Sequence, residues 1–381
     1  MSTLSHDERA SLADALSRVL ARQYGFASGR RQNLAIAPEQ LPPIWSTLSE
    51  LGLHAVMVSP DFGGFGGGAD EIQLVQRQFG RSLLVAPWFQ VAICAHAVAR
   101  AGSPTQQGAL LPPLSDGRAV MVLADRDAVE LDAEPKVTQA HDTARGWRLE
   151  GRKTAVLHAG LATHYLVPAV TPNGGTGLFV VDSSAVGIGC HLSRLVDGSW
   201  SGDLRFESVD AQPLEGLSLQ HHGEVYRSTE ALAIAGVTAD ALGACEAALE
   251  MTVQHLRTRK QFGQSLGDYQ ALRHRVAEMY IELEQVKSAC DLAAEAVEGV
   301  DSVQPTRGTA QALLVMSQSA TWILQQAIQL HGGMGMTDEV AVGHCYRRML
   351  VLNARWGDTR EALARLRGDG MTKEMPGVAG S

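Results

Sequence analysis

The spacing of apolar residues changes twice along this chain, and that change limits the folds the chain can adopt. Up to about Gly117, and again from about Thr229 to Arg367, apolar residues recur at steps of three and four, which is typical of amphipathic helices. From Ala119 to about Gln220 the chain instead has short alternating runs separated by Gly, Asp, Ser and Asn. Helical patterns do not separate these short runs, so a parallel βαβ sheet is disfavoured.

This order predicts an α+β fold that is mostly α. We expect an N-terminal helical domain over residues 1–117, a middle antiparallel β-domain (a small sandwich or barrel) over 118–220, and a C-terminal four-helix bundle over 221–367. Residues 368–381 are expected to form a flexible tail. The bundle is predicted from apolar steps close to 3.5 residues in Leu272, Val276, Met279, Leu283 and Val286, repeated in Leu313, Met316, Ala320, Ile323, Ala327 and Leu330.

Charge and cysteine content narrow the class of protein. The 381 residues carry a formal net charge of −9 and contain no basic run, which disfavours a nucleic-acid or anionic-membrane partner. No apolar stretch reaches the roughly 18 residues needed to span a bilayer, and the N-terminus lacks the pattern of a secretion signal. The 5 cysteines are scattered, which favours free thiols in a reducing compartment. We therefore expect a cytoplasmic protein.

Two familiar binding patterns are weak here. The segment Gly64-Phe-Gly66-Gly-Gly-Ala69 fits G-x-G-x-x-A, but helical segments lie on both sides of it, so an interhelical loop is favoured over a dinucleotide site. The histidines do not show the spacing of metal ligands, so no metal site is expected.

Two segments of the C-terminal region are more specific. Arg257-Thr-Arg259-Lys-Gln-Phe262-Gly263 closes one predicted helix, and Tyr269-Gln270 opens the next. Gln329-Leu-His-Gly332-Gly333 ends another. Each has a plain structural interpretation, because cations offset the dipole at a helix C-terminus and glycines cap helices.

Together, at this separation and behind a β-domain, the two segments resemble those of the acyl-CoA dehydrogenase family. The similarity extends over nearly the whole chain and includes the Pro60-Asp-Phe-Gly-Gly-Phe-Gly66 loop, Leu111-Pro-Pro-Leu-Ser-Asp-Gly117 and Arg347. It implies an FAD-dependent, tetrameric protein in which these segments hold the pyrophosphate and adenosine of a neighbouring subunit's FAD. The residues so implied are Arg259, Phe262, Gly263, Tyr269, Gln270, Gln329, Leu330, His331, Gly332 and Gly333.

The chain departs from this family where the catalytic base is expected. The family's reaction removes the α-proton of an acyl-CoA thioester with a carboxylate while a hydride passes to the flavin. Counted without a gap, the position of the usual glutamate is Trp356, which cannot accept a proton. The alternative position of the base, on an earlier helix, is Ala233. Glu230 and Asp358 lie nearby and are the weak candidates for a displaced base.

The β-domain departs as well. The family's flavin-contacting T-E-P-x-A-G-S-D segment corresponds to Ala124-Asp-Arg-Asp-Ala128, and its W-I-T segment to Ala155-Val-Leu157. A stacking ring and a hydroxyl donor are therefore missing, whereas the residues that serve a neighbour's FAD remain.

Three hypotheses follow from the sequence. The chain is a subunit that lacks the base and completes a partner's FAD site in an α2β2 heterotetramer, with a bulky or polar acyl-CoA as substrate of the complex. Alternatively, it is an autonomous flavoenzyme, in a homo-oligomer, whose base is Asp358 or Glu230. In the third hypothesis it is an enzymatically silent scaffold that uses the bundle for assembly.

Overall fold

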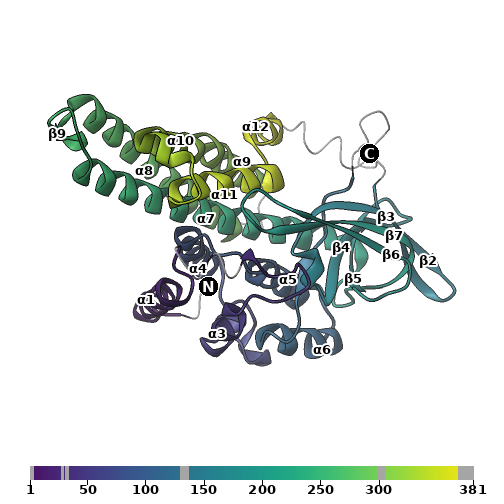
Figure 1. The fold of residues 1–381 in the computed structure, drawn as a ribbon. Helices are drawn as coiled ribbons and strands as arrows, with labels where there is room; N and C mark the ends of the chain where they lie inside the picture. Colours follow the sequence, from purple (N-terminus) through teal and green to yellow (C-terminus); the bar gives the residue numbers. More distant parts are fainter. Residues whose placement is uncertain (1–3, 27–29, 31–33, 129–136, 299–304, 368–381) are drawn as a thin grey trace.

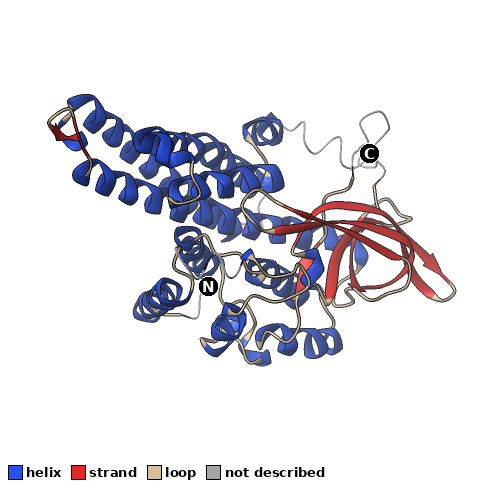
Figure 2. Ribbon diagram, viewed as in Figure 1, coloured by secondary structure: helices blue, strands red, loops and turns tan. Residues whose placement is uncertain are grey.

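The computed structural model describes residues 4–26, 30, 34–128, 137–298 and 305–367, so the predicted tail at 368–381 lies outside the described residues. Helices at the N-terminal end, a β-domain and a long helical bundle follow one another along the chain (Figures 1 and 2). The expected order of helical domain, β-domain and helical domain is confirmed.

The N-terminal part is helical, with short connections. A capping box between Ser5 and Glu8 starts its first helix. Its helices are α1 (His6–Gln23), α3 (Ile44–Glu50), α4 (Ala69–Ser82), α5 (Trp88–Ala101) and α6 (Pro104–Ser115). The loop before α4 contains a 3₁₀ turn, Pro60–Phe62, because the Ser59 side chain accepts a hydrogen bond from the Asp61 N–H at 3.3 Å. Among the described residues that precede the Gly64–Ala69 pattern there is no strand, in agreement with an interhelical loop.

The middle part is a seven-stranded sheet. Its strands are β1 (Met121–Leu123), β2 (Gln139–Thr143), β3 (Gly146–Leu157), β4 (His164–Val170), β5 (Thr176–Asp182), β6 (Ile188–Arg194) and β7 (Trp200–Pro213). The pairings β4–β2, β2–β3, β3–β7, β7–β5 and β5–β4 return to their starting strand, which makes a barrel. Most pairings of the expected antiparallel β-domain are antiparallel, but β4 pairs in parallel with β1 and β2. The long connections between these strands permit parallel pairing, which no two-residue turn allows.

The C-terminal part is the helical bundle. Its elements are α7 (His222–Thr258), the hairpin β8 (Lys260–Gln261) and β9 (Gln264–Ser265), α8 (Gln270–Glu298), α9 (Pro305–Val315), a π-helical turn (Met316–Ala320), α10 (Thr321–His331), a 3₁₀ segment (Gly332–Met336), α11 (Ala341–Trp356) and α12 (Thr359–Arg367). The helix Leu219–Thr258 is long and apolar enough to cross a membrane by composition, but 94% of its most apolar window is buried inside the protein. Its composition therefore reflects a central core helix.

Two glycines set the close crossing of α4 and α7. A Cβ atom at Gly80 would lie 1.9 Å from the Asp240 carbonyl oxygen, and one at Gly243 would lie 2.0 Å from the Arg77 carbonyl oxygen. Neither position can carry a side chain without separating the helices. The N-terminal helices are thereby packed directly on the bundle (Figure 1).

A buried charge network ties the bundle to the other parts. Arg348 of α11 donates to Asp240 of α7 at 2.6 and 3.1 Å and to Asp197, in the loop between β6 and β7, at 3.1 Å. Although burial lowers the pKa of Arg348, the two carboxylates raise it above its ordinary value. Arg30 adds a hydrogen bond to the Asp197 carbonyl at 3.0 Å.

Candidate functional site

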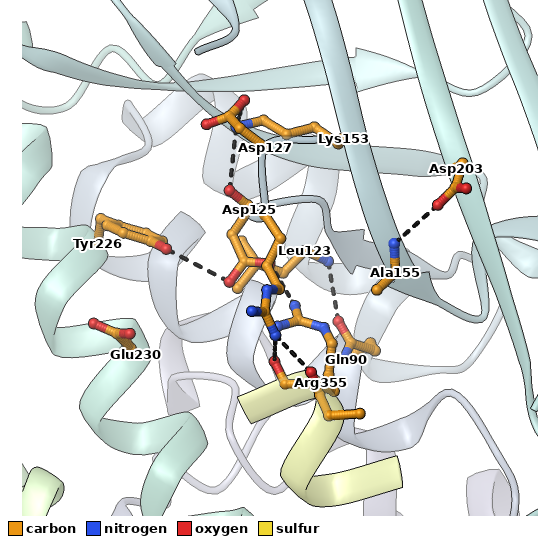
Figure 3. Close-up of polar contacts among 12 residues, drawn as sticks. Gln90, Leu123, Asp125, Asp127, Lys153, Ala155, Asp203, Tyr226, Glu230 and Arg355 are labelled. Carbon is orange, nitrogen blue, oxygen red and sulfur yellow. Dashed lines mark hydrogen bonds and ion pairs between the residues drawn. The ribbon is translucent and has the colours of Figure 1, made fainter. Parts of the chain in front are cut away.

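The segment after β1 meets the end of α11 (Figure 3). Asp125 forms an ion pair with Arg355, and the exposed fractions of the two side chains are 9% and 4%. The Arg126 guanidinium donates to the carbonyl oxygens of Ala354 and Arg355 at 2.6 and 3.0 Å, so it satisfies carbonyls at the end of this helix. The segment that corresponds in sequence position to the family's flavin contacts is therefore joined to α11 by polar contacts within the chain.

Trp356, which counting along the sequence aligns with the family's base, is a core residue. Its side chain is 5% exposed, and the Phe89 ring packs against it edge-on at 5.7 Å. The Arg355 guanidinium carbon lies 4.3 Å from the centre of the Trp356 ring, within the range of a cation–π contact. The cavity that Trp356 and Phe89 help to line measures only about 30 Å³. This pocket has space for about one water molecule and not for a ring system.

A bulge in β3 holds Ala155 in the left-handed region, with φ of 53°. The Ala155 N–H donates to the Asp203 carboxylate at 3.1 Å (Figure 3). The Thr154 hydroxyl donates to the same oxygen at 2.5 Å. The backbone N–H at this position, which corresponds to the start of the family's W-I-T segment, is therefore satisfied by a side chain of β7.

Lys153 is a buried cation that sequence reasoning missed. Its side chain is 1% exposed, and its ammonium lies 2.8 Å from the Asp127 carboxylate. It also donates to the Asp125 carbonyl oxygen at 3.2 Å. Asp127 in turn accepts two hydrogen bonds from Thr138. These contacts fix the segment after β1, and the only sequence signal was a lysine within an apolar alternating run.

Two buried donors near this segment have no hydrogen-bond partner in the described structure, Arg355 Nε and Gln90 Nε2. The Gln90 oxygen is occupied, because it accepts from the Leu123 N–H at 3.1 Å (Figure 3). Gln90 also lines the 30 Å³ cavity. This cavity has room for a water molecule that could bond to Gln90 Nε2, but not for a larger group beside Trp356.

Both candidates for a displaced base have contacts of their own. The Asp358 carboxylate caps α12 by accepting from the Glu361 N–H at 2.9 Å. Glu230 lies 3.0 Å from the Arg365 guanidinium. Asp358 also lines an open groove of about 610 Å³ with Ser317, Thr321, Asn353, Arg360 and Arg367.

The first of the two C-terminal segments forms the hairpin between α7 and α8. Arg259 is an exposed residue that directly follows α7. Phe262 and Gly263 make the two-residue turn with φ of 53° and 87°, and the Phe262 side chain is 92% exposed. Tyr269 donates to the Gln261 carbonyl at 3.3 Å, and Gln270 is the exposed first residue of α8.

The second segment ends α10. Gln329, Gly332 and Gly333 are exposed, and Leu330 is half-buried. A Cβ atom at either glycine would meet nothing within 4 Å, so the backbone there is open to an approaching group. Gly332 has a φ of 62° and a ψ of −143°, a conformation that favours glycine.

A histidine pair brings the two segments to one end of the bundle. The rings of His255, in the last turn of α7, and His331, the last residue of α10, are stacked with centres 4.5 Å apart. Arg259 lies one turn beyond His255, and Gly332 directly follows His331. This end can therefore present a cation, Arg259, and an exposed glycine segment to an anion, although the Gly332 N–H itself donates to the Gln329 carbonyl oxygen. Among the described residues, no group of three or more His, Cys, Asp or Glu side chains could hold a metal ion.

Comparisons with known proteins agree with this architecture. The family description "Acyl-CoA dehydrogenase, N-terminal domain" matches residues 6–118, and "Acyl-CoA dehydrogenase, C-terminal domain" matches residues 230–365. The chain therefore belongs to the acyl-CoA dehydrogenase family, whose members are oxidoreductases acting on acyl-CoA.

Relatives of known sequence and structure extend over most of the chain. Acyl-CoA dehydrogenase FadE27 of Mycobacterium tuberculosis is 28% identical and covers 77% of this chain and 78% of its own length. L-prolyl-[peptidyl-carrier protein] dehydrogenase of Pseudomonas fluorescens is 27% identical over 78% of this chain and 82% of its own length. A variant of the Tcur3481-Tcur3483 steroid ACAD has a TM-score of 0.83 at 25% identity, covering 96% and 98% of the two chains. The ChsE4-ChsE5 complex of Mycobacterium tuberculosis has a TM-score of 0.84 at 23% identity, covering 99% and 100%, which supports the shared fold.

Proposed function

We propose that this chain is the subunit of a heteromeric acyl-CoA dehydrogenase that completes a partner's FAD site and lacks the catalytic glutamate. The complex would desaturate an acyl-CoA thioester between its α and β carbons, with the base and the flavin-ring site on the partner. The observation that carries this proposal is the packed core at the position of the base, where Trp356, Arg355 and Asp125 contact one another or close neighbours.

The residues around Trp356, where this chain would bind its own flavin ring, do not fit an isoalloxazine. Trp356 is buried against Phe89, and the cavity beside it has a volume of about 30 Å³. The buried Asp125–Arg355 pair adjoins Trp356, and opening this core in a way that separates the pair would leave two buried charges without partners, which is strongly unfavourable. We therefore derive no catalytic step at this position.

The opposite end of the bundle does fit part of an FAD molecule. Arg259 offers a planar, forked cation suited to a pyrophosphate, and Gly332 and Gly333 leave their backbone open. The exposure of Phe262 supports docking against a partner. Its backbone is in the left-handed region and its side chain is 92% exposed, so packing within its own chain contributes little to its stability. When bound, FAD would supply the hydride acceptor, while Arg259 and the glycine backbone would hold its phosphates.

The class of partner and substrate is inferred by analogy. Structures of the same fold include the Tcur3481-Tcur3483 steroid ACAD and the ChsE4-ChsE5 complex, each named for two components. These favour a heteromer and, for the acyl chain, a bulky group such as a steroid side chain. The described cysteines are all free, and four of the five are buried, which supports a reducing cytoplasmic location.

One observation favours the autonomous flavoenzyme. Asp358 faces a groove of about 610 Å³, large enough for part of a cofactor or substrate. In that case the chain alone would purify with flavin, and an acyl-CoA would bleach it. The proposed subunit role predicts a colourless chain by itself.

The test is co-expression with an acyl-CoA dehydrogenase subunit that carries the missing glutamate. We expect a yellow complex with one FAD per pair of subunits, and we expect Arg259→Ala in this chain to remove the flavin from the complex. Arg145→Ala, which changes an exposed cation in the turn between β2 and β3, is the matched control and should retain it. A homotetramer with one FAD per chain would reject the subunit role. Full flavin content in the Arg259→Ala complex would favour the silent scaffold.

A further inference from the structure

Two histidines occupy the proposed FAD-donating end of the bundle. His255 lies four residues before Arg259, so both project from the same face of α7 as it ends. Its ring stacks on His331 at 4.5 Å with an interplanar angle of 25°, and His331 directly precedes the glycine pair. The two imidazoles therefore lie between the two segments that are proposed to hold the pyrophosphate.

The two rings differ in their hydrogen bonds. His331 is buried, and its Nδ1 lies 2.8 Å from the Ala327 carbonyl oxygen, so this nitrogen carries the proton and donates it. No hydrogen bond to a ring nitrogen of His255 occurs within the described residues, and the side chain is half-buried. His255 thus has donor capacity available to a ligand.

The surroundings of His255 in the free chain disfavour its charged form. Burial, followed by the charges of His331 on α10 and of Arg259, which directly follows α7, lowers the pKa of His255. The carbonyl ends of α7 and α10 act in the opposite direction, because the C-terminus of a helix favours a cation. The pyrophosphate of FAD carries two negative charges in all, and when held by Arg259 it would bring opposite charge within a few ångströms of His255 and favour the imidazolium.

On the basis of the proposed function, we propose that His255 is a further phosphate-binding residue of the donated FAD site, positioned by its stack on His331. As an imidazolium it donates a hydrogen bond to the pyrophosphate beside Arg259. Binding of the pyrophosphate is then accompanied by proton uptake at His255. Affinity for the pyrophosphate must increase as the pH falls through the pKa of His255 in the complex, and level off below its pKa in the free chain.

The chain alone allows a first test, with inorganic pyrophosphate as the probe and the imidazole signals followed by NMR from pH 5 to pH 8. We expect saturating pyrophosphate to raise the pKa of His255 by about one unit, the size of shift that one nearby opposite charge produces. The exposed His274 of α8 should not change. In Arg259→Ala the shift of His255 should vanish. An unchanged pKa of His255, with or without detectable binding at millimolar pyrophosphate, would overturn the assignment.

The flavin-loaded complex provides the second test. Between pH 8 and pH 5 we expect the Kd for FAD to fall about tenfold, corresponding to a pKa change of one unit. His255→Phe keeps an aromatic ring on His331 but cannot titrate, so its Kd should be nearly independent of pH, whereas His274→Phe should behave as the unmodified complex does. The same pH dependence in His255→Phe would refute the role of His255 and leave the subunit function intact. Flavin retention in Arg259→Ala would instead reject the FAD-donating function.

Discussion

Arg355 and Asp125 form a buried ion pair although 230 residues separate them in the sequence. The pair joins the end of α11 to the segment that follows β1, so it links the bundle to the β-domain. A second contact reinforces it, because the Tyr226 hydroxyl on α7 lies 3.5 Å from the other Asp125 oxygen. The contact between the bundle and the β-domain is therefore filled by the chain's own side chains, namely the Asp125–Arg355 pair and Trp356.

The first prediction concerns this pair. Asp125→Asn removes the negative charge and leaves the Arg355 guanidinium buried without a counter-ion, so we expect a loss of about 3–5 kcal/mol in the free energy of unfolding. Asp116→Asn, in an ion pair with Arg118 whose side chains are 43% and 72% exposed, is the control and should change stability by less than about 1 kcal/mol. Urea denaturation of the three proteins measures both values. Equal midpoints for Asp125→Asn and the unmodified chain would show that the pair is solvated in solution.

Trp356 is predicted to act as a core residue. Trp356→Ala leaves a cavity beside Phe89 and removes the cation–π contact with Arg355, so we expect a loss of about 3–5 kcal/mol. Trp356→Phe should lose less, since it keeps an aromatic contact. Tyr280→Ala, at a position 54% exposed on α8, should alter stability by no more than about 0.5 kcal/mol. Thermal unfolding followed by circular dichroism distinguishes these variants, and a neutral Trp356→Ala would contradict the packed core.

The order of the domains could be predicted from the sequence, but the long-range contacts between the domains and within the β-domain could not. Helical and alternating patterns are local, and they identified the elements that became α8, α10, β5 and β7. The pairing of Asp125 with Arg355 and the parallel contact of β1 with β4 are long-range, and neither leaves a local pattern. The close crossing at Gly80 and Gly243 was missed for the same reason.

Part of the candidate site could be predicted from the sequence, because a departure from a known motif is a local feature. Trp356 and the Ala124–Ala128 segment each stood out individually against a known motif, whereas their proximity came only from the structure. His255 was overlooked, although its spacing of four residues from Arg259 was a usable signal.

The crossing of α4 and α7 gives a third prediction. Gly80→Ala places a methyl group within 2 Å of where the Asp240 carbonyl now lies, so the helices must separate and the protein should lose several kcal/mol or fail to fold. Gly108→Ala in α6 is the matched control, because a Cβ atom there meets nothing within 4 Å and alanine is the better helix former. We expect that variant to gain about 0.5–1 kcal/mol. Comparing soluble yield and melting temperature of both variants tests the crossing, and a fully stable Gly80→Ala would show that the helices lie further apart.

The fourth prediction separates a capping role of Asp358 from a catalytic one. Asparagine caps a helix about as well as aspartate, whereas alanine does not, so Asp358→Asn should keep its stability and Asp358→Ala should lose about 1 kcal/mol. If Asp358 only caps α12, both variants should leave turnover of the reconstituted complex unchanged. Loss of turnover in the stable Asp358→Asn variant would instead support the relocated base.

The last prediction concerns stability in acid. His54 is 3% exposed, its ring lies 4.0 Å from the Trp45 ring, and burial lowers its pKa to about 4. In the unfolded chain a histidine titrates near 6.5, so between these two pH values the unfolded state binds more protons than the folded state. The stability contributed by the neutral ring is therefore complete above about pH 6.5 and decreases as the pH falls toward 4.

This single group should account for up to about 3 kcal/mol of acid destabilisation. His54→Leu keeps an apolar side chain against Trp45 but cannot titrate, so its free energy of unfolding should change less with pH across that interval. His191→Gln, at an exposed position on β6, should leave the pH profile unchanged. Urea titrations at half-unit pH steps from 7 to 4 provide the measurement. Parallel profiles for His54→Leu and the unmodified chain would mean that His54 becomes protonated without unfolding and that the space beside Trp45 admits water.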